Sequence, residues 1–221
     1  MSTCDHNLSN KQQLRDDEEM NSIQRNGKKI QIKVAGGCYV VHWEILAGAG
    51  LFEDLRDDQV IVLDEEYETI DYFVQWLYTS GNFFKVPEIK TVLKLWIFAD
   101  KMKLLRLQNY CMDFIQDHYL RNDKYMDLDE LQYVFGATEG AGKGGFLLKK
   151  FCVAQLHFQN SIEGSKAVAY FLRTVPAAIV AYLDYETSCK MDSDNDPRSR
   201  EMFPCEFHFH RGRGDCQTKL E

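Results

Sequence analysis

Four side chains of the kinds that bind zinc lie close together near the end of the sequence: Cys205, His208, His210 and Cys216. Thiolate sulfur and imidazole nitrogen are the usual zinc ligands of proteins. Their C-x2-H-x-H-x5-C spacing differs from that of a zinc finger. On a strand, His208 and His210 would share one face, because successive side chains alternate there. The pattern leaves two interpretations open, a zinc site or a reduced terminal segment that binds no metal.

Two further features raise the question of catalysis. The glycine-rich stretch 136–145 contains Gly142-Lys143 but lacks the hydroxyl residue that holds magnesium in a phosphate-binding loop, so we interpret it as a connection. His42 has no nucleophile or orienting group placed beside it by a known motif, and we expect it to be structural. We therefore predict no enzymatic reaction and no cofactor. A zinc-dependent enzyme or metal-binding protein that uses the terminal ligands is the alternative.

The composition is that of a globular chain: 221 residues, 45% hydrophobic, with a net charge of −8. This negative charge argues against broad binding to nucleic-acid phosphates. The N-terminal residues form no apolar signal region, and no apolar run approaches the roughly 20 residues that a membrane helix needs. We expect a cytoplasmic or nuclear protein that binds neither nucleic acid nor membrane, with its seven cysteines reduced.

Hydrophobic periodicity predicts an α+β fold in which short strands precede helices. Ile30, Ile32 and Val34 alternate with polar residues, which indicates a half-buried strand, and Cys38–Val41 completes a hairpin. A third strand is predicted at Gln59–Asp64. Predicted helices cover residues 43–55, 70–78, 89–102, 104–119, 128–135, 146–158 and 166–185, with Pro176 breaking or kinking the last one.

Four stretches resemble the BTB/POZ domain family in their order and spacing: VAGGCYVVHWEILAGAGLF (34–52), QVIVLDEE (59–66), IDYFVQWLYTSGNF (70–83) and LKLWIFADKMKLLRLQNYCMDFI (93–115). The helical extension and the Cys- and His-containing end resemble fungal proteins that carry this domain alone. The expected organisation is a disordered tail (1–28), a BTB/POZ-like domain of short strands and flanking helices (29–120), a helical extension (121–187) and a flexible tail (188–221).

The resemblance implies a non-catalytic scaffold or adaptor that binds partner proteins, as a homodimer or a heterodimer. A substrate adaptor of a cullin-type ubiquitin ligase is the narrower alternative, with Leu55 and Asp57 as the cullin contact. We expect the partner-binding surface to be exposed and apolar, on the first strand and first helix. Its predicted residues are Ile30, Ile32, Trp43, Leu46, Leu51, Phe52 and Leu55.

Two positions depart from the family's pattern. Lys29 and Trp43 stand where relatives often carry an acidic and a basic residue that line the dimer groove. Lysines that face each other across a two-fold axis would repel. We therefore expect a monomer or weak homodimer that prefers heterotypic partners.

Overall fold

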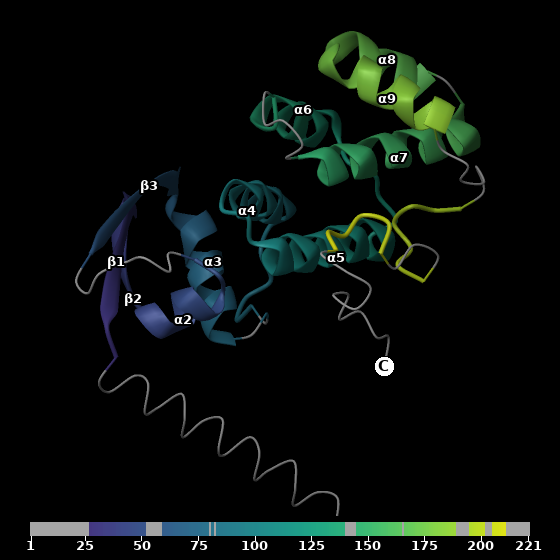
Figure 1. The fold of residues 1–221 in the computed structure, drawn as a ribbon. Helices are drawn as coiled ribbons and strands as arrows, with labels where there is room; N and C mark the ends of the chain where they lie inside the picture. Colours follow the sequence, from purple (N-terminus) through teal and green to yellow (C-terminus); the bar gives the residue numbers. More distant parts are fainter. Residues whose placement is uncertain are drawn as a thin grey trace, which may run out of the picture. The chain divides into compact units, whose positions relative to one another are not determined.

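The computed structural model of the chain describes residues 27–51, 59–79, 81, 83–139, 145–164, 166–188, 195–201 and 205–210. The described part combines a small sheet with helices, which confirms the predicted α+β class. Figure 1 labels the elements, which are in chain order β1 (Lys29–Ala35), β2 (Gly37–His42), α2 (Trp43–Gly48), β3 (Val60–Glu66), α3 (Tyr67–Thr79), α4 (Ile89–Lys101), α5 (Leu105–Arg121), α6 (Leu128–Ala137), α7 (Phe146–Glu163), α8 (Lys166–Thr174) and α9 (Ala177–Ser188).

The strands of the sheet lie in the order β2-β1-β3. β1 and β2 form an antiparallel hairpin that turns at Gly36, whose φ of +97° is a backbone conformation that glycine adopts at little cost. β3 pairs with β1 in parallel, so the chain has to cross over after β2 before it can pair again. α2 lies in this crossover.

The buried face of β1 forms the centre of the sheet's hydrophobic core. Ile30, Ile32 and Val34 are at most 8% exposed, and the residues between them are exposed, as expected for a half-buried strand. α3 contacts all three strands of this sheet and α2 contacts β2. Leu46 of α2 and Phe73 of α3 are buried with the strand residues.

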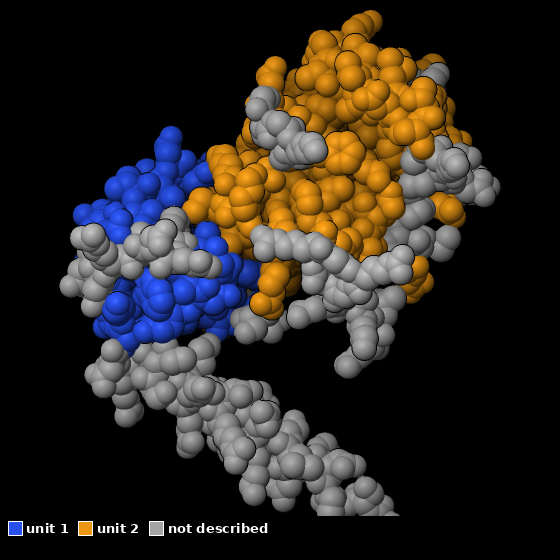
Figure 2. Space-filling view, in the orientation of Figure 1, with its two compact units in different colours: residues 1–82 blue, residues 83–221 orange. Residues whose placement is uncertain are grey.

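The chain divides into two compact units, residues 1–82 and residues 83–221, which Figure 2 colours separately. The first unit holds the sheet with α2 and α3, and the second holds the helices from α4 onward. Contacts therefore group α4 and α5 with the later helices, while the predicted limits of the BTB/POZ-like domain at residues 29 and 120 stay predictions.

In the second unit, α4 packs against α5, and α7 packs against α8 and α9. The predicted helix 166–185 is two helices, because Pro176 lies between α8 and α9 and cannot continue a helical hydrogen-bond pattern. None of the described helices is both long and apolar enough to cross a membrane. Fully buried aromatic side chains of this unit include Trp96, Phe98, Phe135 and Phe151.

Residues 195–201 and 205–210, which we call the C-terminal segment, pack into the second unit. Phe207 is 1% exposed, Arg198 4% and His208 6%. The prediction of a flexible tail is therefore wrong for these residues. They form neither helix nor strand, so hydrophobic periodicity contains no signal of their packing.

Candidate functional site

The face of the sheet opposite the core carries exposed apolar side chains. Val40, Val60 and Val62 are 55%, 41% and 77% exposed. Gln31 of β1 pairs with Val40 on one side and Val60 on the other, and Lys33 pairs with Val62 in the next row. Residues paired across neighbouring strands point to the same face. These five residues therefore form one surface, which we call the outer sheet face.

Four of the predicted partner-binding residues lie inside the first unit. Ile30 and Leu46 are 0% exposed, Ile32 is 1% exposed and Leu51 is 4% exposed. The prediction that these side chains form an exposed surface is therefore wrong. The alternation along β1 showed which side chains share a face, but a strand's sequence does not state whether that face is covered by the chain's own helices or by a partner.

Trp43 is half-buried at the start of α2. Its backbone N–H donates to the carbonyl oxygen of Lys28 at 2.8 Å, and the Lys28 ammonium lies 5.7 Å from the centre of the indole ring. This cation–π contact and the hydrogen bond hold the start of α2 against the residue that precedes β1. Phe52, Leu55 and Asp57, which include both predicted cullin contacts, lie outside the described residues.

His42, at the end of β2, is held by Tyr78 of α3. The backbone N–H of His42 donates to the Tyr78 hydroxyl oxygen at 3.1 Å, and the ring Nδ1 lies 2.8 Å from the same oxygen. Burial raises the pKa of Tyr78, although the hydrogen bond from the His42 backbone lowers it in part. The protonated hydroxyl can therefore donate to Nδ1. This geometry agrees with the structural role expected for His42.

The described members of the predicted zinc site lie in different environments. Cys205 is half-buried, His208 is buried and His210 is exposed. Nε2 of His208 lies 3.1 Å from Oδ1 of Asp113 on α5. In the part of the chain that the structure describes, no three His, Cys, Asp or Glu side chains are grouped so as to hold a metal ion. Cys216, the fourth predicted ligand, lies outside that part.

A row of polar side chains on α5 contacts the C-terminal segment. We call Asn109, Asp113, Gln116 and Asp117 the α5 polar stripe, because spacings of three and four residues place them on one side of the helix. Asn109 pairs with both backbone groups of Phe209. Its Nδ2 donates to the carbonyl oxygen at 3.0 Å, and its Oδ1 accepts from the N–H at 2.9 Å.

The rest of the stripe binds Pro197 and Arg200. Gln116, 1% exposed, donates from Nε2 to the carbonyl oxygen of Pro197 at 2.9 Å. Arg200 forms two parallel hydrogen bonds to Asp117, from Nε to Oδ1 at 2.7 Å and from Nη2 to Oδ2 at 3.0 Å. Its Nη1 also lies 3.3 Å from Oδ1 of Asp113. Every member of the stripe thus contacts the C-terminal segment.

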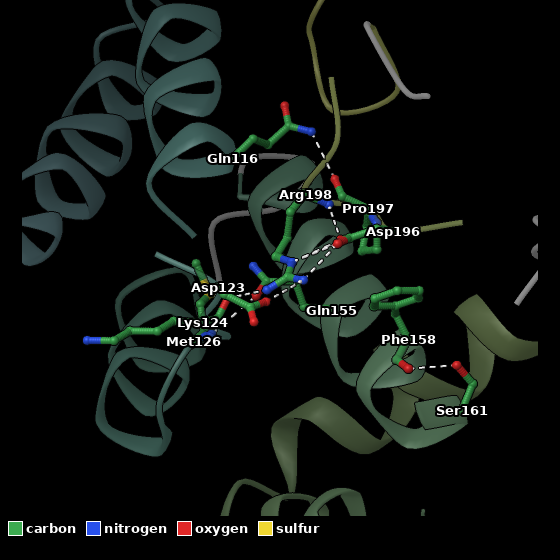
Figure 3. A network of polar contacts seen from close by, with 10 residues as sticks. All are labelled: Gln116, Asp123, Lys124, Met126, Gln155, Phe158, Ser161, Asp196, Pro197 and Arg198. Carbon is green, nitrogen blue, oxygen red and sulfur yellow. Dashed lines mark hydrogen bonds and ion pairs between the residues drawn. The ribbon is translucent and has the colours of Figure 1, made fainter. Parts of the chain in front are cut away.

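Arg198 is bound between the loop that follows α5 and Asp196, two residues before it in the chain (Figure 3). Nη1 donates to the carbonyl oxygen of Lys124 at 2.8 Å, and the guanidinium carbon lies 4.2 Å from the centre of the Tyr125 ring. Asp196 accepts hydrogen bonds from Nε and Nη2. Burial lowers the pKa of Arg198, but the Asp196 carboxylate more than offsets this, so the guanidinium stays charged.

Aromatic side chains fix the far end of the segment. The Phe207 ring packs edge-on against Phe151 of α7, with ring centres 5.1 Å apart, and Phe209 lies 6.4 Å from Trp96 of α4. Sequence reasoning missed this docking. The available signal was a polar row at helical spacing on α5, and such a row ordinarily indicates a solvated helix face.

Comparisons with known proteins add no family to this description. Searches against family models, curated proteins and solved structures found no match. The outer sheet face and the α5 polar stripe are the two candidate functional surfaces of the described residues.

Proposed function

We propose that the chain is a non-catalytic protein–protein interaction module of the BTB/POZ type, and that it binds a partner protein through the outer sheet face. The observation behind this proposal is the exposure of Val40, Val60 and Val62 on a sheet whose other face is buried. Exposed apolar side chains that gather on one surface mark interaction sites. A partner that covers them removes apolar area from water, which favours association.

The order of elements supports the assignment to this type of module. The hairpin, α2, β3 and α3 follow one another in the first unit, and α4 and α5 come next in the chain. This is the order of the stretches by which the sequence resembles the BTB/POZ family.

The charge on the outer sheet face favours a partner other than a second copy. Lys33 is exposed beside Val62. In a two-fold dimer built on this face, the two Lys33 ammonium groups would approach each other and repel. An acidic partner surface with an apolar centre would pair with both the lysine and the valines.

The test compares the full chain with Val62→Asp on the outer sheet face and with Val180→Asp on α9, where the valine is 66% exposed. Each immobilised chain is incubated with lysate of the cells that produce it, and bound proteins are quantified by mass spectrometry. We expect at least one protein to bind the wild-type and Val180→Asp chains about tenfold more strongly than Val62→Asp, a difference of about 1.4 kcal/mol.

Equal binding to all three chains, or to none, would refute the proposal. Purified cullin N-terminal domain is added in a separate arm, which tests the ubiquitin-ligase adaptor directly. Sedimentation at micromolar concentration completes the series. A tight homodimer that Val62→Asp dissociates would show that the partner is a second copy.

A further inference from the structure

The C-terminal segment forms turns, one of them closed by a hydrogen bond from the Ser199 N–H to the Asp196 carbonyl oxygen, and side chains of α5 bind its backbone. Asn109 satisfies both the N–H and the carbonyl of Phe209, and Gln116 satisfies the carbonyl of Pro197. Buried backbone groups need such partners, and a side-chain amide supplies them where no neighbouring strand does. Because these bonds go to the backbone, they do not depend on which side chain the bound residue carries.

Selectivity comes from side chains that enter defined surroundings. Arg198 lies on the Tyr125 ring with its Nη1 on the Lys124 carbonyl. A planar guanidinium suits this combination of an aromatic face and a fixed acceptor better than an ammonium does. Arg200 meets Asp117 with two parallel hydrogen bonds, the geometry that makes arginine–carboxylate pairs strong and specific.

Two positive charges of the segment lie beside carboxylates of α5 and of the loop that follows it. The helix side presents the carboxylates of Asp113 and Asp117, and Asp123 lies 3.5 Å from Nη2 of Arg198. The segment brings the two guanidinium groups. The surface thus favours a ligand with arginines at these two positions, although the segment is not basic as a whole, because it also carries Asp196, Glu201 and Glu206.

We propose that the α5 polar stripe and the loop after it form a peptide-binding surface, and that the C-terminal segment is its intramolecular ligand. The external ligand that fits is a segment of a partner protein that forms similar turns and carries a Pro-Arg pair, a second arginine two residues later and an aromatic residue further on. This surface belongs to the second unit alone, and the proposal does not depend on the outer sheet face.

The chain's own segment limits access to this surface. A ligand on the same chain acts at an effective concentration that reaches millimolar values. A partner segment in trans therefore binds only when it is tighter or when the intramolecular contacts are weakened. When no partner is bound, the C-terminal segment therefore covers the α5 polar stripe.

The test measures the binding of a fluorescently labelled synthetic peptide of residues 195–210 by anisotropy. The full chain is used as wild type and as the double variant Arg198→Ala/Arg200→Ala, whose own segment has lost both guanidinium groups. We expect the peptide to bind the double variant at least about tenfold more tightly than the wild type. A control peptide with both arginines replaced by alanine should bind neither chain.

The expected affinity should fall at least about tenfold when Asn109→Ala is added to the double variant, because its amide pairs with the backbone of Phe209. Circular dichroism checks that each chain is folded, and the single variant Arg200→Ala replaces the double variant if the latter is not. Binding to neither chain, equal binding to both, or binding that ignores Asn109→Ala would overturn the proposal.

Discussion

The hydroxyl group of Tyr78 is one of the contacts between the sheet and α3. The oxygen of Tyr78 accepts the backbone N–H of His42 and lies 2.8 Å from its Nδ1. A phenylalanine of the same shape would leave the backbone N–H and the ring Nδ1 of His42 without this partner. A buried donor that loses its acceptor destabilises the folded state, because the cost of removing it from water is no longer offset by a hydrogen bond. Removal of a solvated hydroxyl has little effect on stability.

We therefore expect Tyr78→Phe to lower the free energy of unfolding by about 1–2 kcal/mol. Urea unfolding followed by circular dichroism measures the change. Tyr170→Phe is the matched control, because Tyr170 is 56% exposed. If both variants lose the same stability, the Tyr78 hydroxyl has no special role.

Residue chemistry was only partly predictable from sequence, because the contacts that decide it come from distant parts of the chain. The structural role expected of His42 agrees with its contact to Tyr78. His208 was one of four candidate zinc ligands because of its spacing to the other three, whereas its buried ring lies beside Asp113. Spacing within a short stretch cannot reveal a carboxylate that belongs to a helix much earlier in the chain.

At the scale of elements, α6 begins with a reciprocal cap. The Glu130 N–H donates to Asp127 Oδ1 at 2.8 Å, and the Asp127 N–H donates to Glu130 Oε2 at 2.9 Å. The hydroxyl of Tyr119 also donates to Oε2 of Glu130 at 2.8 Å. The capping box thus fixes the start of α6 and connects it to α5.

Asp127→Ala should lower the free energy of unfolding by about 1 kcal/mol, because one N–H of the first helical turn loses its acceptor. Asp129→Ala is the control, since Asp129 is an acidic residue in the same turn that is exposed and leaves the capping box intact. Thermal unfolding of the two variants decides the point. A loss at position 129 as large as that at 127 would indicate a general effect of charge at the helix start.

The elements themselves were largely predictable, because their signals are local. Alternation placed a strand at Ile30–Val34, and Pro176 indicated a break where α8 and α9 meet. Predicted limits differ from the observed ones by a few residues, as at α7, which extends to Glu163 instead of residue 158. The predicted helix 43–55 corresponds to α2, which ends at Gly48; residues 49–51 lie outside the helix, and residues 52–55 lie outside the described part of the chain.

The second unit as a whole depends on a segment outside its helices. Phe207 is 1% exposed and packs against Phe151. Phe207→Ala should lower the free energy of unfolding by about 3–5 kcal/mol, as truncation of a buried phenylalanine does. Phe84→Ala should change it by less than about 0.5 kcal/mol, because Phe84 is 82% exposed. Urea denaturation of both variants tests this, and similar losses would show that the segment contributes no core.

Contacts at this scale were the part that sequence reasoning could not supply. Composition made residues 188–221 resemble a polar tail, and an isolated segment with this composition would not order by itself. The described residues 195–201 and 205–210 pack against the second unit because α5 offers Asn109 and Gln116 as partners for their backbone. The surface against which such a segment packs depends on the fold of the whole unit, and the local sequence pattern does not indicate it.

The pairing of Asn109 with Phe209 joins positions that are 100 residues apart. Ribosomes add about 5–20 residues per second, so α5 is synthesised about 5–20 s before the residue that covers its first amide. Until then, this face of α5 is uncovered on the nascent chain, and chaperones or a neighbouring nascent polypeptide can bind it. The order of synthesis thus gives other ligands of the α5 polar stripe a period in which they need not displace the C-terminal segment. Slower translation would lengthen this period.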